Sequence, residues 1–130
     1  MFKINDTVIE TFSYSQEDVI NFAKISGDIN PIHLDEEYSK NTIFKKPIIH
    51  GFLGGSIFSK ILSKSFWGQG TIYLSQSLNL KKPMYVEKEY KAKLIIIDIN
   101  KTKNIAKFKT IVLEEDERII IEGEAVIKYP

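Results

Sequence analysis

The sequence contains no cysteine among its 130 residues. This absence excludes disulfide bonds, a thiolate nucleophile, cysteine-ligated zinc and iron–sulfur clusters. The chain also lacks an apolar run of about 18 residues, the length that a membrane-spanning helix needs, and its first residues do not resemble a signal peptide. We therefore expect a cytoplasmic protein without a membrane span.

An excess of charge of either sign is also missing. The 18 basic and 17 acidic side chains give a net charge of +1, so no overall field attracts nucleic acid or a membrane surface. Hydrophobic residues make up 43% of the chain, which is ordinary for a globular protein. We expect one domain over residues 1–130, with neither nucleic acid nor membrane as a partner.

A helix is predicted soon after the N-terminal strand. Ser15 can cap its start, and residues 16–18 place polar and acidic side chains in its first turn, where the helix dipole favours them. Gly27 is suited to end the helix in the left-handed conformation, and Pro31 disfavours helix at the residue before it. Asp28 should therefore lie in a bend just beyond a helix C-terminus.

Residues 51–67 carry apolar side chains around most of the helical circumference, so we expect a helix that is buried on most sides. Its Gly54 and Gly55 are poor helix formers, which indicates close approach of a sheet, a partner chain or a ligand. Alternating or β-rich segments predict strands at residues 7–14, 71–80, 89–99, 105–113 and 118–128. The short charged connections between the last strands favour an antiparallel meander. These features predict an α+β fold, an antiparallel sheet wrapped around one long buried helix, with a sheet edge free to pair with a second copy.

The segment 71–80 is predicted to be a single strand with two different faces. Strict alternation places four apolar residues on the same face, namely Ile72, Leu74, Leu78 and Leu80.

The segment "SGDINPIHLD" (26–35) holds one of only two histidines in the chain. Asp28 and His33 lie five residues apart across a bend, so a carboxylate and an imidazole could meet at one small ligand and exchange protons near neutral pH. The alternative is structural, with Asp28 capping backbone N–H groups and His33 satisfied by neighbours. Asn30 could orient a ligand or simply occupy a turn position.

The segment "PIIHGFLGGS" (47–56) enters the long helix. The N–H of Gly51 should be an unsatisfied first-turn donor, which together with the helix dipole could stabilise an oxyanion; water fills such donors otherwise. We interpret His50 as a structural residue at the helix entry. Ser56 and Ser59 lie inside the helix without the sharp turn that a serine nucleophile needs. Two histidines without a ligand spacing also predict no metal site.

Taken together, four segments resemble the (R)-specific enoyl-CoA hydratases, the hydratase 2 family of MaoC-like proteins. They are "FAKISGDINPIHLDEEYS" (22–39), "KPIIHGFLGGSIFSKIL" (46–62), "GQGTIYLSQSLNLKKPMYV" (68–86) and "GEAVIKYP" (123–130). The resemblance covers essentially the whole chain, and its Gly-Asp-x-Asn-Pro-x-His core is the specific part. It implies a hot-dog fold and a homodimer, or a dimer-based oligomer, with active sites near the subunit interface.

The resemblance also assigns roles to residues. Asp28 and His33 match the catalytic pair, Asn30 matches its supporting residue, and Gly51 matches the residue whose N–H binds the thioester oxygen. Ser59 aligns with a serine found near the pair in short-chain members. The implied reaction is hydration of a trans-2-enoyl-CoA to an (R)-3-hydroxyacyl-CoA and its reverse, with an acyl-CoA thioester as substrate and no cofactor, since coenzyme A is part of that substrate.

Other activities remain open at this point. A dehydratase acting on acyl carrier protein could use the same Asp/His pair, and Lys81 and Lys82 could contact a phosphate or simply be a solvated strand end. A non-catalytic acyl-CoA-binding module would show stoichiometric binding instead of turnover. Residues 51–67 contain no Asp or Glu, which disfavours hot-dog thioesterases and dehydratases with a carboxylate on the central helix.

Overall fold

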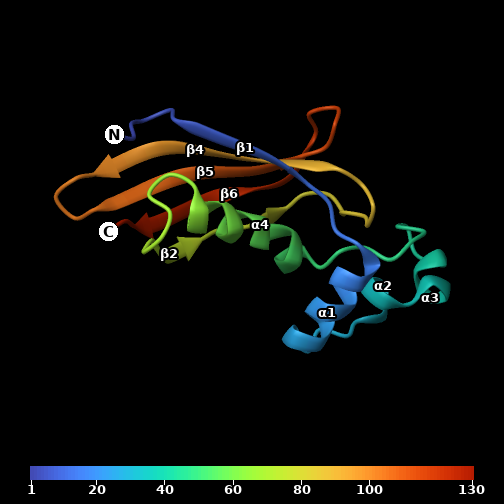
Figure 1. Ribbon diagram of the computed structural model, residues 1–130. Helices are drawn as coiled ribbons and strands as arrows, with labels where there is room; N and C mark the ends of the chain where they lie inside the picture. Colours follow the sequence, from blue (N-terminus) through green and yellow to red (C-terminus); the bar gives the residue numbers. More distant parts are fainter.

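The computed structural model describes residues 1–130 and contains one antiparallel sheet and four helices (Figure 1). The helices are α1 (Gln16–Ser26), α2 (Pro31–Leu34), α3 (Glu36–Lys40) and α4 (Gly51–Lys64). The strands are β1 (Thr7–Phe12), β2 (Ile72–Gln76), β3 (Asn79–Leu80), β4 (Tyr90–Asn100), β5 (Ile105–Leu113) and β6 (Ile119–Lys128). The sheet order is β1-β4-β5-β6-β2, with β3 also paired to β6. Strands β4, β5 and β6 thus form the predicted antiparallel meander.

Helix α4 packs against the sheet and supplies much of the core. Its Ile57, Phe58 and Ile61 are buried in one cluster with sheet residues such as Leu94 and Phe108. In the same helix, a Cβ placed on Gly54 would lie 2.6 Å from Met84 Sδ and 3.1 Å from Ile121 Cδ1. The close approach predicted at Gly54 is therefore confirmed, and its neighbours belong to the sheet and to the segment leading into it.

The prediction that α4 is buried on most sides is wrong for one side of the helix. Phe52 is 74% exposed, and Ser56 and Ser59 are also exposed, because the single sheet covers only one face of the helix. The helix also ends at Lys64 instead of continuing to residue 67. The chain leaves the helical path at this end, where Phe66 has a left-handed φ of 60°.

Residues 71–80 do not form one strand as predicted. The segment divides into β2 and β3, and the register of β2 against β6 shifts between Tyr73 and Ser75. Such an irregularity changes which side chains face the core. Leu78 packs against the core, whereas Ile72 (58%), Leu74 (50%) and Leu80 (50%) are exposed, so the four apolar residues do not share one face as predicted.

The contact between β6 and the segment joining β2 to β3 predicts a large stability effect. A Cβ on Gly123 would overlap the backbone oxygen of Ser77, and a backbone atom cannot move aside as a side-chain tip can. We expect Gly123→Ala to lower the free energy of unfolding by about 1–3 kcal/mol, the usual range for overpacking, as measured by urea denaturation.

The matched control is Gly55→Ala. There the atoms nearest to a new Cβ belong to the flexible side chain of Leu78, at 3.0 Å and beyond, and alanine gains about 1 kcal/mol of helix propensity over glycine. A Gly123→Ala variant as stable as the Gly55→Ala variant would contradict the contact.

Local capping signals shape the three short helices near the site. Ser15 and Asp18 form a reciprocal capping box at the start of α1, and Gly27 ends α1 with a left-handed φ of 80°. Asn30 and Asp35 cap α2 and α3 through their side chains. These helices gather beyond the N-terminal end of α4 (Figure 1), which brings the 26–35 loop beside the entry to α4. None of the four helices has the length and apolar character needed to cross a bilayer.

Candidate active site

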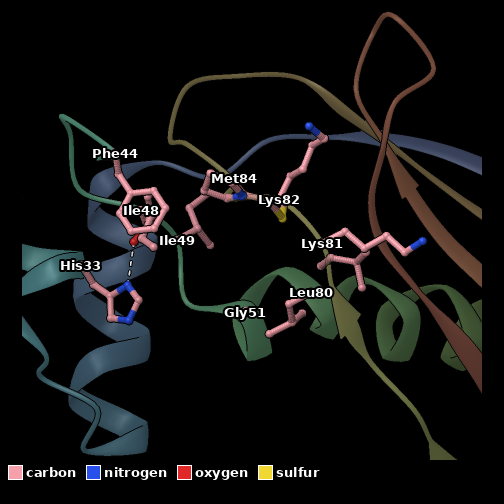
Figure 2. Close-up of a pocket in the computed structure, with 11 residues that line it drawn as sticks. His33, Phe44, Ile48, Ile49, Gly51, Leu80, Lys81, Lys82 and Met84 are labelled. Carbon is pink, nitrogen blue, oxygen red and sulfur yellow. Dashed lines mark hydrogen bonds between the residues drawn. The ribbon is translucent and has the colours of Figure 1, made fainter. Parts of the chain in front are cut away.

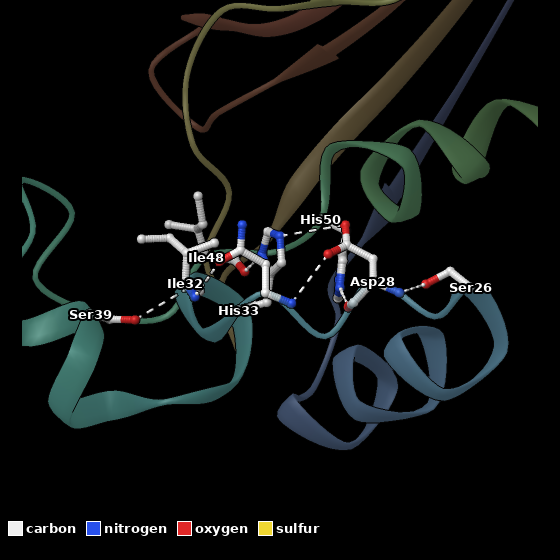
Figure 3. A network of polar contacts seen from close by, with 8 residues as sticks. Ser26, Asp28, Ile32, His33, Ser39, Ile48 and His50 are labelled. Carbon is white, nitrogen blue, oxygen red and sulfur yellow. Dashed lines mark hydrogen bonds and ion pairs between the residues drawn. The ribbon is translucent and has the colours of Figure 1, made fainter.

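Asp28 lies at the start of the loop between α1 and α2, with its two carboxylate oxygens in different environments (Figure 3). Its Oδ1 accepts a hydrogen bond from the Asn30 N–H at 3.3 Å. Its Oδ2 faces His33 Nε2 at 3.9 Å. The side chain of Asp28 remains 51% exposed. Asp28 therefore caps the turn, as the structural alternative proposed, and still presents one oxygen to His33.

The imidazole of His33 is held in one tautomer by the backbone. His33 is buried, at 8% exposure, and its Nδ1 lies 2.7 Å from the carbonyl oxygen of Ile48. Because a carbonyl oxygen can only accept, Nδ1 carries a proton and donates, and Nε2 bears the lone pair in the neutral form of the imidazole. The free lone pair therefore belongs to the nitrogen that faces Asp28, which gives a base and a carboxylate beside one another.

Asn30 shapes the loop between the two members of the pair. Its Oδ1 accepts from the Ile32 N–H at 3.2 Å, and its carbonyl oxygen accepts from the His33 N–H at 3.0 Å. Its side chain thus caps α2 and fixes the turn from which His33 projects. This geometry fits the turn position considered from the sequence; a direct role of Asn30 toward a ligand stays a prediction.

The structure adds His50 to this site, a contact that the sequence does not predict. It is 2% exposed, its Nε2 lies 2.9 Å from the Asp28 carbonyl oxygen, and its ring stacks on His33 with centroids 3.9 Å apart. The two histidines are 17 residues apart, a spacing that matches neither a helix nor a strand repeat and so does not predict their contact. Only the packing of the 26–35 loop on the entry to α4 brings them together.

A cavity of about 310 Å³ lies next to His33 and contains the start of α4 in its wall (Figure 2). Most of its wall is apolar, and the hydrophobic lining residues are Phe44, Ile48, Ile49, Leu80, Met84 and Ile121, together with Pro83. Gly51 also lines it, and no side chain caps α4. The N–H of Gly51, which no side chain caps, is therefore available to a ligand in this cavity, together with the positive end of the helix dipole.

The structure does not bring Ser59 into this arrangement. Ser59 lies two turns along α4, is exposed, and is not among the residues that line the cavity. Its suggested role near the catalytic pair stays a prediction.

Asp28, His33 and His50 offer three possible metal ligands within 4.8 Å of one another. The two imidazole rings are stacked at an interplanar angle of 27°, and each uses one nitrogen on a backbone carbonyl. Ring lone pairs lie in the ring planes, so stacked rings direct them side by side and not toward one point. The arrangement suits acid–base chemistry better than metal coordination.

Comparison with known proteins gives a family for this fold and site. The family model described as "MaoC like domain" matches residues 3–118. The (R)-specific enoyl-CoA hydratase of Aeromonas caviae is 38% identical over 117 residues, which cover 90% of this chain and 87% of the relative. A mitochondrial 3-hydroxyacyl-[acyl-carrier-protein] dehydratase of Arabidopsis thaliana is 35% identical over 133 residues, covering 100% of this chain and 79% of the relative.

Solved structures agree with the sequence matches. The (R)-hydratase of A. caviae that is involved in PHA biosynthesis superposes with a TM-score of 0.95 at 34% identity, covering 99% of this chain and 98% of the other. The chain therefore has the predicted hot-dog fold and belongs to the MaoC-like domain family. The resemblance expected from the four sequence segments is confirmed.

Proposed function

We propose that the protein catalyses the (R)-specific hydration of trans-2-enoyl-CoA to (R)-3-hydroxyacyl-CoA, and the reverse dehydration. The observation that carries this proposal is the pairing of Asp28 Oδ2 with His33 Nε2 at 3.9 Å, next to a cavity lined by His33 and by Gly51, the first residue of a helix that no side chain caps. The similarity to the A. caviae hydratase supports the same reaction. The proposed reaction needs protons but no electron transfer, so it requires no cofactor beyond the coenzyme A of the substrate.

In the proposed mechanism, one water lies between the pair. A separation of 3.9 Å is too long for a direct hydrogen bond, but each atom can reach a shared water at about 2.8 Å. The pair removes a proton from this water as its oxygen bonds to C3 of the enoyl group. The pair then delivers a proton to C2, so the two groups act as one coupled acid–base unit.

The thioester oxygen gains negative charge while C3 is attacked. The N–H of Gly51 and the N-terminal end of α4 would stabilise this enolate-like oxygen. Since the charge develops only toward the transition state, these groups raise the rate of the chemical step more than the affinity for substrate. The apolar wall of the cavity would hold the acyl chain.

The experiment that tests this function follows the enoyl ultraviolet absorbance of crotonyl-CoA after addition of the protein. We expect the absorbance to fall catalytically, with many turnovers per chain. Stoichiometric binding of crotonyl-CoA without loss of absorbance would contradict the proposal and favour a non-catalytic acyl-CoA-binding module.

A second candidate is dehydration of 3-hydroxyacyl groups on acyl carrier protein, favoured by the 35% identical Arabidopsis relative. The rim of the cavity holds two lysines that could meet a carrier phosphate. Lys81 Nζ pairs with Glu122 Oε1 at 3.3 Å, whereas Lys82 forms no ion pair. The ratio of kcat/KM for crotonyl-CoA to that for crotonyl-acyl carrier protein separates the two candidates; we expect it to exceed one.

We further propose that the protein is a homodimer, as the family resemblance implies. Edge strand β2 carries the exposed Ile72 and Leu74, and the open side of α4 carries Phe52. An edge strand with exposed apolar side chains favours association with another chain, because its backbone groups are unpaired and its apolar surface can be buried. The cytoplasmic location stays a prediction from the sequence.

The double substitution Ile72→Asp, Leu74→Asp should disrupt this dimer, because it places charges on the apolar edge. In sedimentation equilibrium we expect twice the mass of one chain for the unmodified protein and the mass of one chain for the variant. A monomeric unmodified protein would contradict the dimer.

A further inference from the structure

We propose that His50 is a positioning residue that aligns both members of the Asp28–His33 pair; this inference rests on the function proposed above. His50 contacts each member in a different way. Its Nε2 lies 2.9 Å from the Asp28 carbonyl oxygen, and its ring stacks on that of His33. It also directly precedes Gly51, so one buried residue is connected to all three groups of the proposed site.

The hydrogen bond from His50 ties Asp28 itself to the entry of α4, whereas the two hydrogen bonds that Ile48 makes with Ile32 and His33 tie the later part of the same loop. Since the carbonyl oxygen of Asp28 can only accept, His50 Nε2 carries the proton and donates. The other hydrogen bonds of Asp28 are local: its N–H donates to Ser26 Oγ at 3.1 Å, and its Oδ1 accepts from the N–H of Asn30. The Ile29 N–H likewise donates to the carbonyl oxygen of Gly27 at 3.1 Å. Such local bonds define the shape of the loop but not its place relative to α4.

The stacking contact restricts the orientation of His33. The His50 ring is almost completely buried and also packs on Phe22, with centroids 4.8 Å apart. A neighbour that cannot move limits the tilt of the His33 ring, and this tilt sets the direction of its Nε2 lone pair. A displacement of about 1 Å in a reacting group can lower the rate about 100-fold. The loss of this alignment should therefore affect the chemical step.

Two nearly isosteric variants, His50→Gln and His50→Met, separate positioning from simple core filling. Both remove the ring, but only glutamine has a side-chain N–H near the former Nε2. We expect kcat for crotonyl-CoA hydration to be about tenfold or more lower in the methionine variant than in the glutamine variant. We expect KM to stay within about threefold, since His50 lies outside the cavity wall.

A second measurement does not depend on turnover. Amide hydrogen exchange at Asp28, Ile29 and Asn30 should be faster in His50→Met than in His50→Gln, at a temperature well below both thermal midpoints. Equal exchange in the two variants would overturn the inference, and so would equal kcat values in an active enzyme. If the unmodified protein does not hydrate enoyl thioesters, the proposed function fails, and the exchange comparison alone decides whether His50 positions the loop.

Discussion

Asp28→Asn is expected to lower kcat for crotonyl-CoA hydration by about 10²–10⁴-fold, the usual contribution of a general acid–base group. Asparagine has nearly the same shape and can still accept the Asn30 N–H through its Oδ1, so the turn stays capped. It cannot hold a negative charge or take a proton from water. The loss should therefore appear in kcat, with little change in KM or in the thermal midpoint.

Asp35→Asn is the matched control for this substitution. Asp35 lies in the same segment and also accepts a backbone hydrogen bond, from the Tyr38 N–H at 3.0 Å, but it caps α3 and takes no part in the pair. We expect kcat of this variant to stay within about twofold of the unmodified protein, because its change is confined to a surface cap. Equal kcat values in the Asp28→Asn and Asp35→Asn variants would contradict the proposed role of Asp28.

His33→Asn is expected to reduce kcat by a similar factor, about 10²–10⁴-fold. The amide nitrogen of asparagine can occupy the place of Nδ1 and donate to the Ile48 carbonyl, which His33 Nδ1 now contacts at 2.7 Å. No atom of the new side chain replaces Nε2, so the base is removed while the structural hydrogen bond remains. Steady-state kinetics and thermal unfolding on the same sample measure the two effects.

His33→Ala serves as the comparison for the histidine. It removes the base and also the hydrogen bond to the partly buried carbonyl of Ile48, a loss of about 1 kcal/mol. We expect both variants to be equally slow, and His33→Ala to lose more stability than His33→Asn, because both lose the stacked ring but only His33→Ala also loses the hydrogen bond to Ile48. Turnover near the unmodified rate in His33→Asn would show that Nε2 is not needed for catalysis.

The parts of the fold that could be predicted from the sequence are those set by local chemistry. Ser15 and Gly27 mark the ends of α1 through a cap and a left-handed residue, and both predictions are confirmed. The alternation in 105–113 predicts β5 with its observed bounds. Errors arose where tertiary contacts decide: the register shift after Tyr73 is set by pairing with β6, and the exposure of Phe52 depends on which side of α4 the sheet covers.

Sequence spacing and family resemblance predict the parts of the site that lie close together in the chain or belong to a family motif. Asp28 and His33 are near one another in the chain, so a bend was enough to suggest their meeting, and the structure places them 3.9 Å apart. The position of Gly51 at a helix start predicts that its N–H is a free donor. For His50 the sequence predicts only a structural role, because its contact with Asp28 spans 22 residues and no local pattern predicts that contact.

The most direct test of the central claim is the configuration of the product formed from crotonyl-CoA. The hydration product would be offered in parallel to an (R)-specific and an (S)-specific 3-hydroxyacyl-CoA dehydrogenase, and the reduced nicotinamide formed would be measured. We predict oxidation by the (R)-specific enzyme only, at a rate limited by the unmodified protein and almost abolished in Asp28→Asn. Oxidation by the (S)-specific enzyme, or no 3-hydroxyacyl product at all, would contradict the proposed function.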